Sequence, residues 1–124
     1  MKMTINYILL GIMALCSYMF GNINWAIIIS KAKKVDIREI GSGNPGTLNM
    51  GRNFGLKIGL LVFFLDILKG VIPCLITYFI FKDRGCFENT TFLIKDFALY
   101  LSGLCVGLGH IYPVFLKFHG GKGI

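Results

Sequence analysis

YILLGIMALCSYMFGNINWAIIIS, residues 7–30, contains no Asp, Glu, Lys or Arg, and it decides the fold class of this chain. A helix needs about 20 apolar residues to cross a hydrocarbon core of about 30 Å, so this stretch predicts a membrane-spanning helix. It is longer than the apolar region of a signal peptide, and Lys2 alone is a weak basic start for one. Asn22 and Asn24 interrupt its second half, and we expect such polar groups to face protein or a cavity rather than lipid.

Two further apolar runs follow, at residues 58–81 and 97–116. The whole chain is 55% hydrophobic and 15% charged, with a mean hydropathy of +0.69, outside the range of soluble domains. The sequence therefore predicts an all-α, polytopic membrane protein with three spanning helices in a single unit, residues 1–124.

The placement of charge predicts the topology. Residues 31–57 carry six basic side chains against two acidic ones, whereas residues 82–96 carry three of each. The positive-inside rule therefore places the first loop in the cytoplasm, the second loop and the N-terminus outside, and residues 117–124 in the cytoplasm. The net charge of +7 would suggest nucleic acid in a soluble protein, but no basic face here is long enough to bind a duplex.

The first cytoplasmic loop contains GSGNPGTLNMGR, residues 41–52, which has the composition of an anion-binding loop. Glycine lets backbone N–H groups approach a ligand closely, short polar side chains add donors, and arginine provides a charged fork that matches phosphate oxygens. The candidate phosphate-binding residues are Ser42, Gly43, Asn44, Gly46, Asn49 and Arg52. A plain polar turn between two hydrophobic helices is the alternative.

A second segment of the same kind, residues 109–124, emerges on the same predicted side of the membrane. Gly120, Gly121 and Lys122 again combine a bare backbone with a cation, so the two segments together suggest a site for two anionic groups. His110 could act there as a base, as a hydrogen-bond donor to phosphate or as a structural residue, and the donor and structural roles are favoured.

Two features lie inside the second and third spans. Asp66 and Lys69 are spaced i,i+3, so we expect them to pair and to orient their helix rather than perform chemistry. The third span carries a small-residue face suited to close helix packing, formed by Ser102, Gly103, Gly107 and Gly109.

Nucleotide and metal sites are not expected. Residues 41–46 match G-x-G-x-x-G formally, but no strand precedes them, and Lys122 lacks the remainder of a Walker loop. The four cysteines have no Cys-x-x-Cys spacing, and we expect neither a disulfide, nor a metal, nor a cofactor.

The chain resembles the acyl-phosphate-dependent glycerol-3-phosphate acyltransferases of bacterial membranes, the PlsY-type family. The family pattern S-G-N-x-G-x-x-N-x-x-R is matched at residues 42–52, and G-H-x-x-P-V-F-L-K-F-x-G-G-K-G at residues 109–123. VDIREIGSGN at 35–44 and FFLDILKG at 63–70 also resemble family segments. The resemblance covers nearly the whole chain, and two long motifs in the same order are highly specific.

The resemblance implies transfer of a fatty acyl group from acyl phosphate to the 1-hydroxyl of glycerol 3-phosphate, in the bacterial inner membrane and among its lipids. It implies that Ser42, Arg52 and residues 120–122 cradle phosphates, while Asn44 and Asn49 brace the loop or contact glycerol phosphate. Arg52 and Lys122 would also stabilise the departing phosphate. We expect the acyl phosphate itself to accept the hydroxyl proton, and His110 is the less favoured alternative. Family members have about seven spanning helices, so the chain corresponds to the N-terminal part of that fold. An inactive remnant and a lipid-binding or transport subunit are the alternatives.

Overall fold

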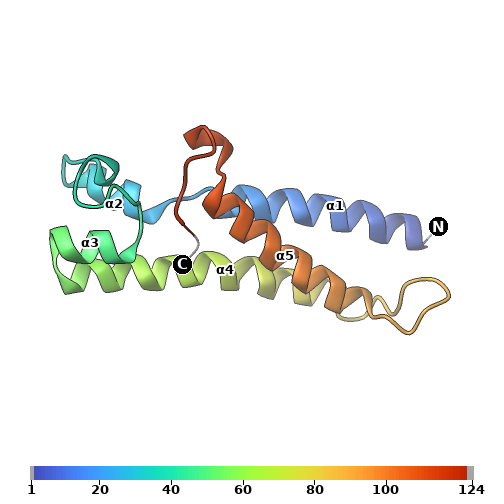
Figure 1. Cartoon of the computed structure of the whole chain (residues 1–124). Helices are drawn as coiled ribbons and strands as arrows, with labels where there is room; N and C mark the ends of the chain where they lie inside the picture. Colours follow the sequence, from blue (N-terminus) through green and yellow to red (C-terminus); the bar gives the residue numbers. More distant parts are fainter. Residues whose placement is uncertain (1, 123–124) are drawn as a thin grey trace.

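The computed structural model describes residues 2–122, which form a bundle of three long helices with two short helices at one end (Figure 1). The α-helices are α1 (Lys2–Gly21), α2 (Trp25–Ala32), α3 (Thr47–Phe54), α4 (Leu56–Phe81) and α5 (Ile94–Ile111). Two 3₁₀ turns, η1 (Ile37–Glu39) and η2 (Val114–Leu116), lie in the connecting segments. The helix α5 packs against both α1 and α4, and α3 packs against the start of α4.

Three stretches are long and apolar enough to cross a membrane: Met3–Ala32, Leu56–Phe81 and Ile94–Leu116. The prediction of an all-helical protein with three spans is therefore confirmed. Large apolar side chains remain exposed along all three spans, including Leu15, Phe64 and Leu104. Hydrocarbon is the environment in which such side chains are stable on the outside of a helix bundle.

The first span is not the continuous helix that the sequence predicted over residues 7–30. It breaks between α1 and α2, where Asn22 and Asn24 are both buried. The side chain of Asn24 caps α2 by accepting a hydrogen bond from the N–H of Ile27 at 3.0 Å. The Asn22 Oδ1 accepts a hydrogen bond from the N–H of Val114 at 3.1 Å. The expectation that these amides face protein is confirmed, and the same contacts stop the helix.

The segment 31–57, predicted as a loop, contains the helix α3. Periodicity did not identify this helix because it has only eight residues, a length at which an isolated helix is marginal. Tertiary contacts hold it, since Met50 is fully buried beside Ile37 and Val62. Where α3 meets α4, a Cβ added at Gly59 would lie only 2.9 Å from the Cα of Gly51. The two backbones thus approach at a distance that only glycine permits.

The contact between α1 and α5 depends on small residues in the middle of the bundle. The hydroxyls of Ser17 and Ser102 lie 2.8 Å apart, and both serines are buried. Gly109 packs directly on the backbone of Tyr18, so any side chain there would overlap it. The predicted small-residue face is correct at Ser102 and Gly109. At the other two glycines of the set, Gly103 and Gly107, no described atom lies within 4 Å of an added Cβ, so the described helices do not pack closely on them.

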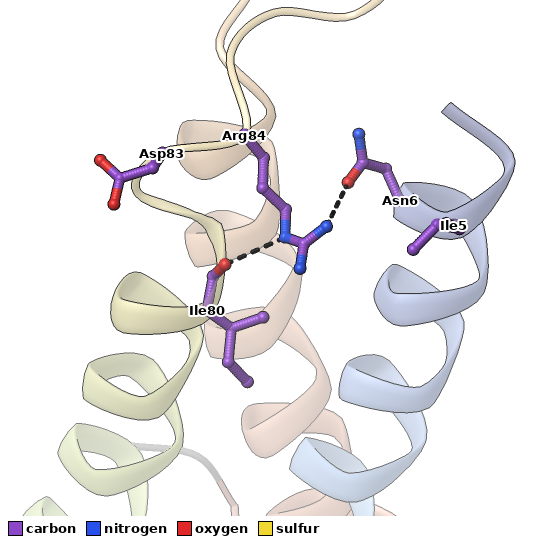
Figure 2. A pocket seen from close by; sticks show the side chains of 5 residues that line it. All are labelled: Ile5, Asn6, Ile80, Asp83 and Arg84. Atoms are coloured by element: carbon purple, nitrogen blue, oxygen red, sulfur yellow. Dashed lines mark hydrogen bonds between the residues drawn. The ribbon is translucent and has the colours of Figure 1, made fainter. Parts of the chain in front are cut away.

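At the far end of the bundle, Arg84 ties α4 to α1 (Figure 2). Its Nε donates to the carbonyl of Ile80 at 3.1 Å, and its Nη1 donates to Oδ1 of the buried Asn6, also at 3.1 Å. Asp83 points away from this pair in Figure 2. A cationic side chain near the C-terminus of a helix also interacts favourably with the helix dipole. Arg84 therefore stabilises the end of α4 and holds α1 beside it at the end of the bundle opposite α3.

Candidate functional site

A buried amide supports the loop that precedes α3. Asn49 is 1% exposed, and its Oδ1 accepts a hydrogen bond from the N–H of Ser42 at 3.2 Å. Its Nδ2 lies 3.0 Å from the carbonyl oxygen of Ile40 and 3.2 Å from that of Asn44. A third carbonyl oxygen, that of Ile37, lies 3.3 Å from the same nitrogen. The side chain of Asn49 is therefore committed to shaping the loop.

The glycines of this loop are required by its backbone conformation. Gly41 and Gly43 have φ of +56° and +76°, in the left-handed region that favours glycine. The N–H of Gly43 donates to the carbonyl of Ile40, and that of Gly46 donates to the carbonyl of Asn44, each at 2.9 Å. The glycine amides therefore stabilise the turn in this structure.

An ion pair holds the segment just upstream of the loop. Asp36 accepts hydrogen bonds from the side chain and the backbone N–H of Arg38, with a shortest distance of 2.7 Å to Nη2. These bonds lower the pKa of Asp36 from 3.8 to about 2, and the same contact raises the pKa of Arg38. Asp36 thereby caps η1, which places the buried Ile37 beneath the loop.

The first turn of α3 offers hydrogen-bond donors that have no partner within the helix. The helix begins at Thr47 after Gly46, and no side chain caps it. Its first backbone N–H groups have no intrahelical acceptor, and the helix dipole adds partial positive charge at this end. Gly46, Thr47 and Leu48 line a cavity, so this helix end is suited to an anion.

The second motif folds back onto the end of α5. Residues Lys117 and Phe118 have positive φ, and they reverse the chain after η2. The N–H of Gly120 then donates to the carbonyl of Ile111 at 3.0 Å, and that of Gly121 donates to the carbonyl of His110 at 3.1 Å. A side chain at Gly121 would overlap the His110 imidazole, so glycine makes room for the ring.

The two motifs meet at one cavity of about 480 Å³. Its walls combine the loop and the start of α3 with the middle of α4, the end of α5 and the returning C-terminal segment. The lining residues are Asn44, Gly46, Thr47, Leu48, Phe63, Asp66, Ile67, His110 and Lys122. Segments more than sixty residues apart therefore place one ammonium and one imidazole opposite the uncapped end of α3.

A buried lysine lies behind the imidazole. The Nζ of Lys69 is 2.7 Å from Nδ1 of His110 and donates to the carbonyl of Ile23 at 2.7 Å. Asp66 Oδ1 lies 3.5 Å from the same nitrogen, which confirms the predicted pairing. Asp66 also lines both cavities beside His110, and Lys69 lines one of them.

Four of the predicted site residues line the cavity: Asn44, Gly46, His110 and Lys122. The other six do not: Ser42, Gly43, Asn49, Arg52, Gly120 and Gly121. Ser42 and Arg52 are exposed on the loop and on α3, and Ser42 Oγ accepts a hydrogen bond from the N–H of Asn44 at 3.3 Å.

Thr47, Leu48, Phe63, Asp66 and Ile67 also line the cavity, although the sequence analysis did not place them there. In the sequence, the charged pair within an apolar span was the signal that the α4 residues could belong to the site. For Thr47 and Leu48 the signal was the start of a helix after Gly46, and this signal is weak because the helix has only eight residues.

The fold and the site define an all-helical, multi-pass membrane protein with a cavity lined by both polar and apolar residues from the loop and from three helices. The model of the glycerol-3-phosphate acyltransferase family matches residues 11–124, and the chain belongs to this family.

Curated relatives and solved structures agree with this assignment. A glycerol-3-phosphate acyltransferase of Mycoplasmopsis pulmonis is 46% identical over 86% of this chain and 45% of its own length. One from Aquifex aeolicus is also 46% identical, over 87% of this chain and 50% of its own. The crystal structure of PlsY (YgiH), an integral membrane glycerol 3-phosphate acyltransferase in its glycerol 3-phosphate form, matches with a TM-score of 0.76 at 42% identity. That match covers 93% of this chain and 52% of the crystallised one. The chain thus spans about half the length of the curated relatives it matches.

Proposed function

We propose that this protein transfers a fatty acyl group from acyl phosphate to the 1-hydroxyl of sn-glycerol 3-phosphate, producing lysophosphatidic acid and inorganic phosphate. The hydroxyl oxygen attacks the acyl carbonyl carbon, and the bond between that carbon and the phosphate oxygen breaks. The departing phosphate takes the hydroxyl proton, so the step needs no protein base. One matching PlsY crystal structure is of the glycerol 3-phosphate form and another is of the lysophosphatidic acid form, named for the substrate and product of this reaction.

The observation that carries this proposal is the meeting of the two motifs at a single cavity. Thr47, at the uncapped start of α3, and Lys122 both line it. Backbone N–H groups at a helix N-terminus and a lysine ammonium are typical partners of phosphate oxygens. Because these donors are held in place before substrate arrives, they can stabilise the charge that develops on the departing phosphate.

The acyl tail has an apolar path leading from the same cavity. A groove of about 620 Å³ runs between α4 and α5 and shares Asp66 and Ile67 with the cavity at which the two motifs meet. Val71, Leu75 and Leu99 continue it along the span, and its surface is almost entirely apolar. Within the proposal, the acyl phosphate lies with its phosphate at the helix end and its chain in this groove.

The remaining residues receive roles from their positions and from the family motif. Asn49 braces the loop, while Asn44 contacts substrate at the cavity wall. The family motif also assigns Ser42 and Arg52 to phosphate, although both are exposed outside the cavity in this structure. Gly120 and Gly121 hold the second segment close to α5, which places Lys122 at the cavity.

The test measures lysophosphatidic acid formed from radiolabelled glycerol 3-phosphate in membranes that contain the protein. Because the chain spans about half of its relatives, we would assay it alone and fused to the second half of the Aquifex aeolicus relative. Acyl phosphate should support synthesis and acyl coenzyme A should not. Lys122→Met should abolish synthesis, whereas Lys57→Met, at an exposed lysine outside both motifs and outside the cavity, should not. Correctly inserted protein that forms no product in either version would refute the proposal.

We also propose a bacterial inner-membrane location with the N-terminus outside and both motifs in the cytoplasm. Lys31 lies in the last turn of α2, and Lys33 and Lys34 follow this helix. Because α2 lies at the same end of the bundle as α3 (Figure 1), these lysines favour this orientation. Cysteine labelling with a membrane-impermeant reagent tests it. A cysteine at Asn89 should react in intact spheroplasts and one at Lys33 only after lysis, on a background without the native cysteines. The reverse labelling pattern would show that the protein has the opposite orientation in the membrane.

A further inference from the structure

The ammonium of Lys69 is the point at which all three spans are joined. The side chain is 3% exposed in the middle of α4. It donates to the carbonyl of Ile23 at the break in the first span, and it lies 2.7 Å from Nδ1 of His110 at the end of α5. The carboxylate of Asp66, one turn earlier in α4, lies 3.5 Å away and balances its charge.

The proton positions on the imidazole depend on the charge of Lys69, and the neighbouring carboxylate of Asp66 favours the charged form. An ammonium group has three donors and no acceptor, so its contact with Nδ1 requires that Nδ1 carry a lone pair. A neutral histidine with a lone pair on Nδ1 carries its proton on Nε2. Doubly protonated His110 would place the Nδ1–H group against the ammonium of Lys69, and a separation of 2.7 Å does not accommodate two facing donors.

The Nε2 edge of the ring is directed toward the returning second motif. A Cβ added at Gly121 would overlap Nε2, so the backbone of Gly121 packs closely against this edge of the ring. Within residues 2–122 no hydrogen-bond acceptor for Nε2–H is observed, and His110 lines the cavity shared by the two motifs together with Lys122 and Asp66. A ligand oxygen that reaches Nε2–H beside Gly121 can take this hydrogen bond.

We propose that Lys69 is a positioning residue that holds His110 as the Nε2–H tautomer, so that His110 donates a hydrogen bond to an oxygen of the bound acyl phosphate. This inference rests on the proposed function for the identity of the ligand. In this tautomer the imidazole is a fixed hydrogen-bond donor toward the negative charge that develops on the phosphate. His110 is then not the acceptor of the hydroxyl proton. The proton then passes to the leaving phosphate.

The direct test is ¹⁵N NMR of histidine-labelled chain in detergent micelles at neutral pH. The chain has two histidines, so His119→Gln leaves only the signals of His110. We expect a pyridine-type resonance for Nδ1 and a pyrrole-type resonance for Nε2. A protonated Nδ1, in either the other neutral tautomer or the imidazolium, would overturn the proposal.

Variants separate the role of Lys69 from a purely structural one. Lys69→Arg should preserve the tautomer, because a guanidinium also only donates. Lys69→Met should give a mixture of both tautomers, while Lys57→Met, at an exposed position in the first turn of α4, should not change the spectrum. An unchanged spectrum in Lys69→Met would contradict the proposal. If that variant does not fold, the parent chain and Lys69→Arg still decide the outcome.

Kinetics of the active protein provide a second readout. Removal of a preorganised donor costs about 10²- to 10³-fold in kcat, so a mispositioned one should cost about tenfold or more, with KM for glycerol 3-phosphate little changed. Combined with His110→Ala, Lys69→Met should lower kcat no further, because it acts through the imidazole. If Lys69→Met lowered kcat as much in the His110→Ala background as in the parent protein, Lys69 would not act through the imidazole. The NMR result requires no turnover, so it stands or fails independently of the proposed reaction.

Discussion

Asn49→Asp replaces one NH₂ group by an oxygen and should release the loop at residues 41–46. The Nδ2 of Asn49 lies 3.0 Å from the carbonyl of Ile40 and 3.2 Å from that of Asn44. A buried carbonyl left without its donor costs about 1–3 kcal/mol, so two lost bonds cost about 2 kcal/mol at the least. The new carboxylate, which is nearly inaccessible to solvent at this position, adds repulsion toward the same oxygens.

Hydrogen exchange followed by mass spectrometry measures this release. At about 1.4 kcal/mol per factor of ten, a cost of 2 kcal/mol should accelerate exchange of the Gly43 and Gly46 amides about 30-fold. The matched control is Asn89→Asp, an exposed residue in the loop at the other end of the bundle, which should leave these amides unchanged. Exchange that rises less than about threefold in Asn49→Asp, or equally in both variants, would refute the bracing role.

Two further predictions concern the elements that hold the loop. The pKa of Asp36 is lowered by Arg38, so the pair stabilises the folded segment above pH 3.8, and this contribution should be lost as the pH falls toward about 2. A ¹³C titration of the Asp36 carboxyl should have its midpoint near 2 and move up in Arg38→Met; a midpoint near 3.8 in the parent chain would contradict the ion pair. Gly59→Ala should destabilise the chain by about 1–3 kcal/mol because its methyl group would meet Gly51 in α3. Thermal unfolding in detergent checks this against Gly70→Ala, where an added Cβ meets open space, and equal melting temperatures would rule out the close crossing.

Much of the site could be anticipated from residue chemistry, but its backbone donors could not. Glycine next to polar residues indicated an anion loop, and the loop glycines do have positive φ at Gly41 and Gly43. The N–H groups of Gly43 and Gly46, however, donate to neighbouring carbonyls, and the open donors lie at the start of α3. A sequence pattern shows where a backbone is accessible, but hydrogen-bond partners depend on the conformation that the loop adopts.

The sequence by itself determined the three spans and the pairing of Asp66 with Lys69. Apolar length and i,i+3 spacing are local properties, and hydrocarbon leaves a helical segment few alternatives. Only the tertiary structure decided that the first span breaks at Asn22 and that Lys69 contacts His110, forty-one positions away. Such contacts join groups far apart in the chain, and their geometry depends on how the helices pack rather than on the sequence around either residue.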